Sequence, residues 1–347
     1  VDQTIDYSLA VPYWAWLYRY PIRRTARTGL TPGTRPWWST PDRLTPAQST
    51  TVAAMCTFNM VAGVLYGLLT QILTFVSADL GDGSAGQQTT MLSVVRLGVV
   101  ITIAAMAFAD RRGRRTVAIW CFVVAGLLTL AGAVAPTWEV FGALQFVARN
   151  LAIAGLLCVD TIAVEELPAG SRAMATGLGS LAYGLGAGVV VVTLPLADLG
   201  AGGWRLSFVV AGVTVPLILH ARRHLPESSR FERLSSDDPP VESRRINGGR
   251  FLLLATMFFL FNVFVAPASQ LQNDYLRVDR GFDGLLIAVF VVATSTPAGI
   301  GVVLGGRLAD IRGRRMAIVP GLSAFGLFSV AFFSLSGPPM WIASLLA

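Results

Sequence analysis

The sequence Asp-Arg-Arg-Gly-Arg-Arg at residues 110–115 recurs as Asp-Ile-Arg-Gly-Arg-Arg at residues 310–315, 200 positions further along the chain. Each copy directly follows a long apolar run. A repeat of this length matches a six-helix bundle that has been duplicated in parallel, as the halves of many transporters are. The repeat therefore predicts two related halves joined by the hydrophilic stretch at residues 222–249.

Nine apolar runs are long enough to cross a bilayer, which takes about 20 apolar residues in an α-helix. They lie at about 52–76, 88–109, 116–135, 138–160, 173–195, 204–221, 250–268, 284–304 and 316–336. A tenth run begins near Pro339 and is still apolar at Ala347. In a twelve-helix protein we therefore expect the chain to continue into the rest of helix 10 and beyond.

The composition agrees with a membrane protein. Only 14% of the residues are charged and the mean hydropathy is +0.61, whereas soluble domains carry about 25% charge. We predict an all-α polytopic membrane protein of two six-helix bundles. Its expected parts are an N-terminal arm at 1–50, the first bundle at 51–221, a linker at 222–249, and helices 7 to 9 with the start of helix 10 at 250–347.

The basic residues predict the orientation of the chain in the membrane. All 27 are arginines, and 22 of them fall in the N-terminal arm and in loops on the same predicted side. Three lie in the opposite loops, namely Arg205, Arg277 and Arg280, and two lie within apolar runs. Because positive residues accumulate on the cytoplasmic side, we expect a multi-pass protein of the cell membrane with a cytoplasmic N-terminus.

The N-terminal arm contains aromatic residues between positions 13 and 20, interleaved with Arg19, Arg23 and Arg24. Such a basic and aromatic stretch is typical of a segment that lies in the membrane interface. Docking onto a partner protein is the alternative interpretation.

The repeated segment resembles the signature GxLxDxxGRR of the major facilitator superfamily. The second copy, residues 306–315, matches it throughout, while the first has Met106 and Phe108 in place of the family's Gly and Leu. Residues 165–172, from Glu165 to Arg172, resemble the ExxPxxxR pattern of sugar porters and metabolite–proton symporters. Residues 225–231, Leu-Pro-Glu-Ser-Ser-Arg-Phe, resemble the PESxRF end of helix 6 in those families.

The resemblance implies a cytoplasmic charge network that latches the two halves in the outward-facing state. Its members here would be Asp110, Arg114, Glu165, Arg172, Glu227, Asp310 and Arg314. The alternative is that these residues only anchor the topology and cap loops. The resemblance is incomplete, because Gln145 stands where the family's helix-4 Arg is expected and helix 1 has no acidic residue. Both departures disfavour a sugar as substrate.

Three ionisable residues fall inside apolar runs, where charge is costly and marks candidate functional sites. Arg149 lies near the middle of helix 4, Arg96 in helix 2 and Asp160 near the inner end of helix 4. Family architecture places helices 1, 4, 7 and 10 around a central cavity. The candidate substrate-binding residues are therefore Arg149, Asn59, Tyr66, Gln71, Asn262 and Arg96. A structural bond between Arg149 and a neighbouring helix is the alternative.

Asp160 is the candidate coupling residue, because burial favours the protonated form of a carboxyl group. Because Asp160 lies close to the cytoplasmic end of its helix, a structural ion pair is the alternative. Five glycines in helix 5, at positions 177, 179, 184, 186 and 188, predict a small-residue packing face.

These features predict a secondary active transporter that moves a small metabolite by alternating access and is coupled to protons. An organic anion is favoured over a sugar. The alternatives are a drug or metabolite efflux pump, whose usual helix-5 proline is missing here, and a non-transporting subunit of a larger membrane complex.

The sequence predicts no enzyme activity, since it offers neither a nucleophile–base set nor paired catalytic carboxylates. We also expect no cofactor and no metal: the two His, His220 and His224, lie at a helix end and are too few for a metal site, and Cys56, Cys121 and Cys158 fall in apolar runs with no metal spacing. The expected partners are a small-molecule substrate, protons and the lipid bilayer, with a protein partner possible through the arm. Nucleic acid is not expected, because the arginines do not form one polar face.

Overall fold

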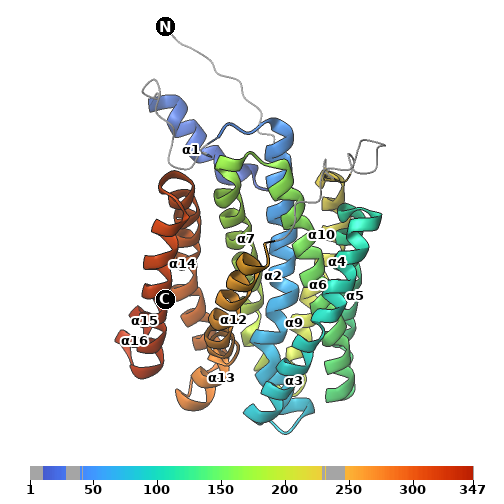
Figure 1. Ribbon diagram of the computed structural model, residues 1–347. Coiled ribbons are helices and arrows are strands. Elements are labelled where there is room, and N and C mark those ends of the chain that lie inside the picture. Colours follow the sequence, from blue (N-terminus) through green and yellow to red (C-terminus); the bar gives the residue numbers. More distant parts are fainter. Residues whose placement is uncertain (1–10, 29–39, 41, 229–230, 232–246, 347) are drawn as a thin grey trace.

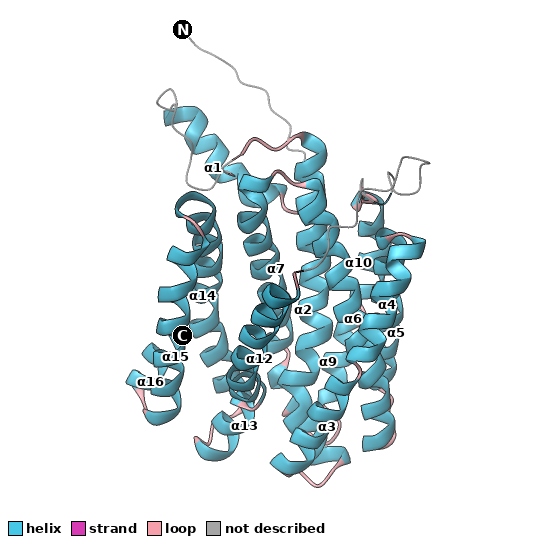
Figure 2. Ribbon diagram, viewed as in Figure 1, coloured by secondary structure: helices cyan, strands magenta, loops and turns pink. Residues whose placement is uncertain are grey.

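The structure of the protein, a computed structural model, describes residues 11–28, 40, 42–228, 231 and 247–346. Within these residues all regular elements are helical (Figure 2), and the long helices run side by side as a bundle (Figure 1). Eight of the described helices are long and apolar enough to cross a membrane, and α14 adds an apolar segment at Gly284–Ser295. The predicted all-helical, polytopic fold is confirmed.

The N-terminal group of helices follows the predicted spans. After the short helix α1 (Ala15–Thr28), it comprises α2 (Pro46–Leu80), α3 (Ala85–Leu97), α4 (Val99–Arg112), α5 (Arg114–Gly132), α6 (Trp138–Glu166), α7 (Arg172–Val192), α8 (Leu194–Ala197), α9 (Trp204–Ala211) and α10 (Thr214–Ala221). Two short 3₁₀ turns lie at Ala169–Ser171 and Arg222–His224.

The C-terminal group comprises α12 (Gly248–Gln270), α13 (Gln272–Asp274), a π-helical turn at Tyr275–Asp279, α14 (Gly284–Arg312), α15 (Arg314–Ser334) and α16 (Pro338–Leu346). Most of the predicted linker, including the Ser- and Pro-rich stretch at 235–240, lies outside the described residues.

The first span begins earlier than the sequence predicts, at Pro46 rather than at residue 52. The reason is a capping box: the Thr45 side chain accepts a hydrogen bond from the Gln48 backbone N–H, and the Gln48 side chain accepts one from that of Thr45. Two free backbone donors at the start of the helix are thereby satisfied. The helix can therefore extend beyond its apolar run.

The helices define two ends of the bundle, which we call the basic end and the opposite end. The basic end, at the top of Figure 1, holds α1 and the turns at Gly113, 167–171, 222–228 and Gly313. The opposite end holds the connections at 81–84, 133–137, 198–203, 271–283 and 335–337. The repeated motif has the same conformation in both copies, because Gly113 and Gly313 have φ of 94° and 95°. This left-handed region favours glycine.

Two glycines bring α2 and α7 into backbone contact. A Cβ atom added to Gly63 would lie 1.9 Å from the carbonyl oxygen of Tyr183, and one added to Gly186 would lie 1.9 Å from that of Met60. Gly184 and Gly188 face open space instead. Of the predicted packing face in helix 5, Gly186 therefore lies in this contact, while Gly184 and Gly188 do not, because they point to another side of the helix.

On another side, α7 packs against α14 of the C-terminal group. A Cβ on Gly306 would lie 2.7 Å from the carbonyl oxygen of Ala173, near the basic end. In the middle of the helices, a Cβ on Gly299 would lie 2.7 Å from a Leu181 side-chain carbon. The two groups thus meet along α7 and α14, backbone to backbone near the basic end and through a side chain further along.

Helix 2 of the sequence prediction is broken into α3 and α4 at Gly98, and Asn150 of α6 explains the break. The Asn150 side chain donates hydrogen bonds to the carbonyl oxygens of Val95, at 2.9 Å, and Phe146, at 2.7 Å. It thereby occupies the Val95 carbonyl, which a continuous helix would pair with the N–H of Val99. A Cβ on residue 98 would lie 2.1 Å from the Asn150 amide nitrogen, so a larger residue there would displace this amide from its hydrogen bonds.

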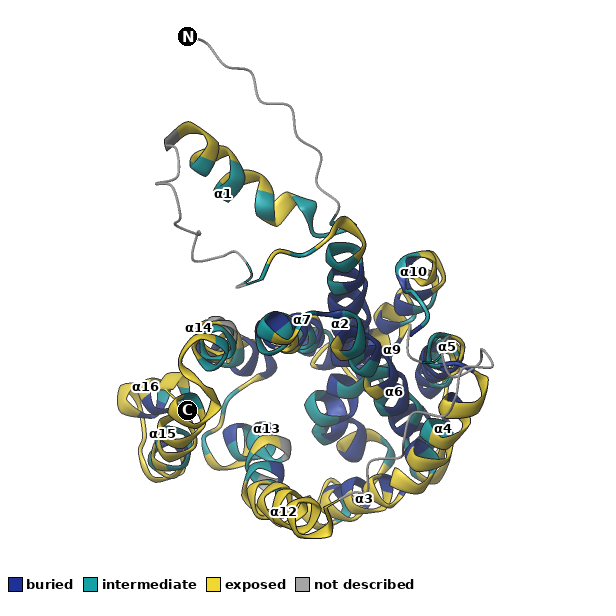
Figure 3. Cartoon of the chain, turned by 45° about the horizontal axis from the view of Figure 1, so that its top comes forward, coloured by how far each residue is buried: buried dark blue, intermediate teal, exposed yellow. Residues whose placement is uncertain are grey.

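Burial is concentrated in the N-terminal group. Figure 3 shows buried residues gathered on α2 and α6, whereas α12 and α15 are mostly exposed. The core of the described structure therefore lies around α2, which contacts α6 and α7 most extensively. This core holds the candidate site.

Candidate functional site

Arg149 of α6 is a buried cation with no acidic partner among the described residues. Its side chain is 4% exposed, and its guanidinium carbon lies 3.6 Å from the centre of the Tyr66 ring of α2. Among the described residues, its Nη2 atom has no hydrogen-bond partner and no carboxylate oxygen lies within 4.0 Å of the guanidinium. The aromatic ring compensates part of the desolvation cost, but a planar donor group remains available.

A second tyrosine completes this cluster. The ring of Tyr183, on α7, lies 6.2 Å from that of Tyr66 between centroids, with an angle of 53° between the planes. Both rings are half-buried. Three helices, α2, α6 and α7, thus each contribute one residue, and a guanidinium with two phenol groups can bind a carboxylate through charge-assisted hydrogen bonds. We call Arg149, Tyr66 and Tyr183 the arginine–tyrosine cluster.

The sequence analysis identified Arg149 and Tyr66 but missed Tyr183. One signal was available, because Tyr183 lies four residues after Gly179 and three before Gly186. That spacing places it on the helix face that carries both glycines. The backbone contact between α2 and α7 described above brings this face, and with it Tyr183, next to Tyr66.

Asp160 pairs with Asn59 and not with Arg149. The Asn59 amide donates a hydrogen bond to Asp160 Oδ1 at 2.9 Å and another to the carbonyl oxygen of Met55 at 3.0 Å. Asp160 and Arg149 are 11 residues apart on α6, which corresponds to about 16 Å along the helix axis. The structure therefore separates a cationic site from a carboxylate site nearer the basic end.

The other candidate binding residues lie elsewhere. Gln71 lies near the opposite end, where it accepts two hydrogen bonds from the Asn273 side-chain amide. One goes to the Gln71 backbone oxygen at 3.1 Å and the other to Gln71 Oε1 at 2.6 Å. Asn262 donates to the Phe258 carbonyl oxygen of its own helix. Arg96 is exposed on α3. Gln145, at the family's expected Arg position, is buried beside Gly132 of α5. The structure thus brings Tyr66, and none of these four, into contact with Arg149.

Four of the seven residues of the predicted charge network, Asp110, Arg114, Glu165 and Glu227, form polar contacts within the N-terminal group. Arg114 forms ion pairs with Glu165 and, at 3.4 Å, with Asp110. Glu165 also accepts a hydrogen bond from the Ser228 hydroxyl. Glu227 accepts a hydrogen bond from the backbone N–H of Arg115 at 3.1 Å. These bonds connect α4, α5 and α6 with the segment after α10.

The remaining members of the network differ in their contacts. Arg172 donates from Nε to the carbonyl oxygen of Leu167 at 3.0 Å. Asp310 accepts from the backbone N–H of Met174 at 2.9 Å and so joins α14 to the start of α7, where a carboxylate is favoured by the helix dipole. Arg314 is exposed, and in the described part of the chain it has no ion pair. Asp310 is therefore the member that connects the two groups.

A set of polar contacts joins the two groups at the opposite end, and we call it the clasp. Arg277 lies 3.3 Å from Asp198, which also accepts from the backbone N–H of Gly284 at 3.0 Å. Gln88 donates to Asp274 at 3.2 Å, and Asn273 bonds Gln71 as described. The sequence analysis noted Arg277 as an outer-loop arginine but could not identify its partner.

Asp198→Asn should shift the protein toward states in which the opposite end is open. The mutation removes the Arg277 ion pair and weakens the bond to Gly284; a pair about one-third exposed contributes about 1 kcal/mol. We expect the ratio of open to closed states to rise about fivefold. Pulsed electron paramagnetic resonance between spin labels at the exposed positions Thr89 and Val278 measures this ratio.

Asp279→Asn is the matched control, because Asp279 is exposed in the same connection and is in no described ion pair. It removes the same charge and should leave the distance distribution unchanged. An equal shift in the two variants would show that the clasp does not hold the opposite end closed.

Comparison with known proteins relates the chain to transporters. The sequence pattern of the Major Facilitator Superfamily matches residues 51–347. The cis,cis-muconate transport protein of Acinetobacter baylyi is 26% identical over 267 residues, which cover 70% of this chain and 62% of that protein. The sialic acid transporter NanX of Escherichia coli is 24% identical, with 79% of this chain and 68% of that protein covered. This chain thus spans less than two thirds of the length of the muconate transporter.

A solved structure shares the fold. A bacterial homologue of the human lysosomal transporter Spinster superimposes with a TM-score of 0.63 at 19% identity, covering 88% of this chain and 73% of that one. The helix arrangement described above is therefore that of a known class of membrane proteins.

Proposed function

The chain belongs to the Major Facilitator Superfamily, and on that premise we propose that it is a secondary active transporter of a small organic anion. The observation that carries the proposal is Arg149, a buried guanidinium that has no carboxylate partner among the described residues. The family and the relatives indicate a transporter rather than an enzyme.

The arginine–tyrosine cluster favours an anionic substrate. A buried charge that lacks a counter-ion is costly, and a bound carboxylate would supply both the opposite charge and acceptors for the free Nη2 atom. Two of the relatives are named for organic acids, muconate and sialic acid. We therefore propose that Arg149 binds the carboxylate and that Tyr66 and Tyr183 orient it.

Alternating access would use the two ends of the bundle in turn. We propose that the basic end faces the cytoplasm, because arginines accumulate there, and that the bundles 51–221 and 250–347 rock about the cluster. The clasp closes the opposite end. Asp310 and the charge network would hold the basic end when it closes, as the family resemblance implies.

Proton coupling is proposed for the Asp160–Asn59 pair. Asp160→Asn should abolish the stimulation of uptake by an imposed pH gradient, because the amide cannot take up or release a proton. Substrate exchange without a gradient should persist at more than about half of its rate, because the near-isosteric amide can still bond Asn59. Uptake and exchange in proteoliposomes measure the two activities, with Asp279→Asn as the control. Gradient-stimulated uptake at the unmutated rate would refute the assignment.

The direct test of the proposed function is uptake by proteoliposomes containing the full-length protein. The assay compares dicarboxylates, acidic sugars, neutral sugars and cationic drugs, each with and without an inward proton gradient. We expect saturable uptake of organic acids, with competition among them and none from neutral sugars. Uptake of cationic drugs alone would favour an efflux pump, and the absence of any uptake together with a co-purifying protein would favour a subunit of a larger complex.

A further inference from the structure

Helix α1 is anchored to the bundle by the two residues that precede it, Tyr13 and Trp14. Trp14 donates a hydrogen bond from its indole N–H to Thr57 of α2 at 3.0 Å. The Tyr13 hydroxyl lies 3.4 Å from Nδ1 of His224, and its ring meets those of His220 and His224 edge to face. These contacts fix the start of α1 beside α2 and the end of α10, so the helix is a defined part of the basic end.

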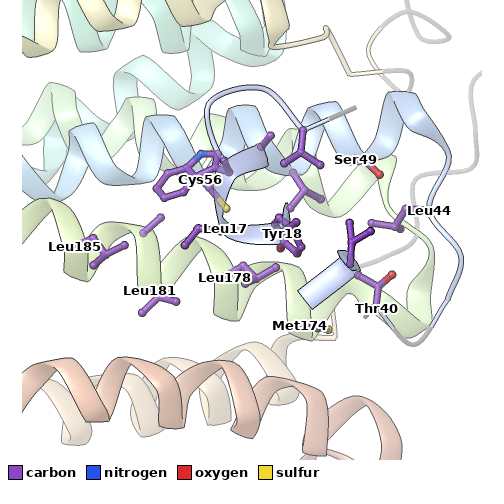
Figure 4. Close-up of a pocket in the computed structure, with 16 residues that line it drawn as sticks. Leu17, Tyr18, Thr40, Leu44, Ser49, Cys56, Met174, Leu178, Leu181 and Leu185 are labelled. Carbon is purple, nitrogen blue, oxygen red and sulfur yellow. The ribbon is translucent and has the colours of Figure 1, made fainter. Parts of the chain in front are cut away.

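A cavity of about 320 Å³ lies between α1, α2 and α7. Its lining includes Leu17, Tyr18 and Ile22 of α1, Cys56 of α2, and Leu178 and Leu185 of α7. Figure 4 shows the leucines in a row along α7 with Tyr18 alongside. The lining is predominantly apolar, and burial raises the pKa of the Tyr18 hydroxyl above its ordinary value.

The cavity has the depth of one lipid leaflet. Its lining on α7 runs from Met174, in the first turn, to Leu185. These 11 positions correspond to about 16 Å, which is about half of a hydrocarbon core of roughly 30 Å. Leu17 and Leu185 are each more than 40% exposed, so the cavity can be reached from the surface of the bundle. Its length and chemistry match one acyl chain that enters from the basic end.

The arginines beside the cavity favour a lipid with an anionic headgroup. Helix α1 carries arginines at positions 19, 23, 24 and 27 and no acidic residue. Arg19 and Arg23 directly follow the lining residues Tyr18 and Ile22, and both are exposed. Arginines near an anionic leaflet favour binding of its lipids, and with the basic end on the cytoplasmic side, as proposed above, that leaflet is the anionic one.

We propose that the cavity between α1, α2 and α7 binds an anionic phospholipid, with one acyl chain along the α7 leucines and the phosphate beside Arg19 and Arg23. The apolar lining supplies affinity for the chain, and the two arginines supply the preference for negative charge. The site is separate from the arginine–tyrosine cluster, so it does not depend on the identity of the transported solute.

Lipid retention tests the headgroup. The full-length protein is purified from vesicles of equimolar phosphatidylglycerol and phosphatidylcholine with identical acyl chains, and the retained lipids are measured by native mass spectrometry. We expect phosphatidylglycerol to be retained in preference. The double variant Arg19→Gln and Arg23→Gln should lower this preference about 30-fold, since each arginine contributes about fivefold.

The matched control is the double variant Arg111→Gln and Arg315→Gln, which removes two exposed arginines from the same end of the bundle. It should keep the preference of the unmutated protein. Equal retention of both lipids by the unmutated protein, or an equal loss of preference in the two double variants, would overturn the proposed headgroup site.

Cavity-filling variants test the acyl-chain site. Leu185→Trp and, separately, Leu178→Trp should reduce retention of both lipids at least fivefold, because the indole occupies the space of the chain. Leu127→Trp, at an exposed position of α5 away from the cavity, is the control. Monodisperse elution on size exclusion selects folded variants. Undiminished retention in either folded cavity variant would overturn the proposal.

Discussion

Arg149→Gln should reduce uptake of organic anions at least 100-fold while leaving the protein folded in the membrane. The loss corresponds to about 3 kcal/mol, within the range for a buried charge-assisted pair whose one partner is removed. Because Arg149 has no described acidic partner, the neutral amide removes a desolvation cost and breaks no ion pair. We therefore expect the melting temperature to stay equal or rise. Proteoliposome uptake and thermal unfolding in detergent measure the two effects.

Arg149→Lys separates charge from geometry. Lys keeps the positive charge but loses the planar fork and the flat contact with the Tyr66 ring, so we expect a loss of about 10-fold or more. Arg96→Gln is the comparison, since Arg96 is the other arginine in an apolar run but is exposed on α3. We expect Arg96→Gln to reduce uptake of organic anions less than Arg149→Gln does. An Arg149→Gln protein that transports normally, or that unfolds, would show the side chain to be idle or structural.

Gly186→Ala and Gly63→Ala should each destabilise the protein by about 3 kcal/mol or more. A Cβ at either position would lie 1.9 Å from a backbone carbonyl oxygen, and backbone atoms of a packed helix cannot move aside as a side-chain end can. Helices α2 and α7 must then separate, at a cost at or above the usual range for overpacking. The melting temperature in detergent should fall by several degrees.

Gly184→Ala and Gly188→Ala are the matched controls, because a Cβ at either position meets nothing within 4 Å. They lie on the same helix, and alanine favours a helix over glycine by up to about 1 kcal/mol. We expect unchanged or slightly higher melting temperatures. If Gly186→Ala melts no lower than Gly188→Ala, the close approach of α2 and α7 is wrong. Because these helices also hold Tyr66 and Tyr183, the two destabilising variants should lose transport as well.

The sequence predicted the fold because the length of an apolar run decides where a helix can cross a bilayer. The glycine of each repeated motif, Gly113 and Gly313, adopts a φ near 95° that its residue type permits, since local backbone conformation depends on local residue type. The sequence prediction of one span at 88–109 was incomplete, because that span is divided into α3 and α4. Hydropathy cannot reveal that Asn150, 52 residues after Gly98, occupies a carbonyl group of that helix.

The sequence predicted less of the candidate site. An in-membrane charge such as Arg149 is conspicuous in any apolar run, but its neighbours depend on how helices cross. Membrane helices are apolar on most sides, so periodicity does not identify the face that meets another helix. The spacing of Tyr183 from Gly179 and Gly186 was a signal, but its position beside Tyr66, like the contact between Arg277 and Asp198, was visible only once the helices were placed in space.

The α7 helix is packed differently on two sides, with backbone contacts toward α2 and mainly side-chain contacts toward the middle of α14. Toward α2, backbone touches backbone at Gly63 and Gly186, so we expect the two helices to move together and to carry both tyrosines with them. Toward α14, the contact at mid-height is with Leu181, a side chain that can change rotamer, and close backbone approach is confined to Gly306 near the basic end. In the proposed rocking motion, we therefore expect α7 and α14 to separate more easily at mid-height and at the clasp than near Gly306, where backbone meets backbone.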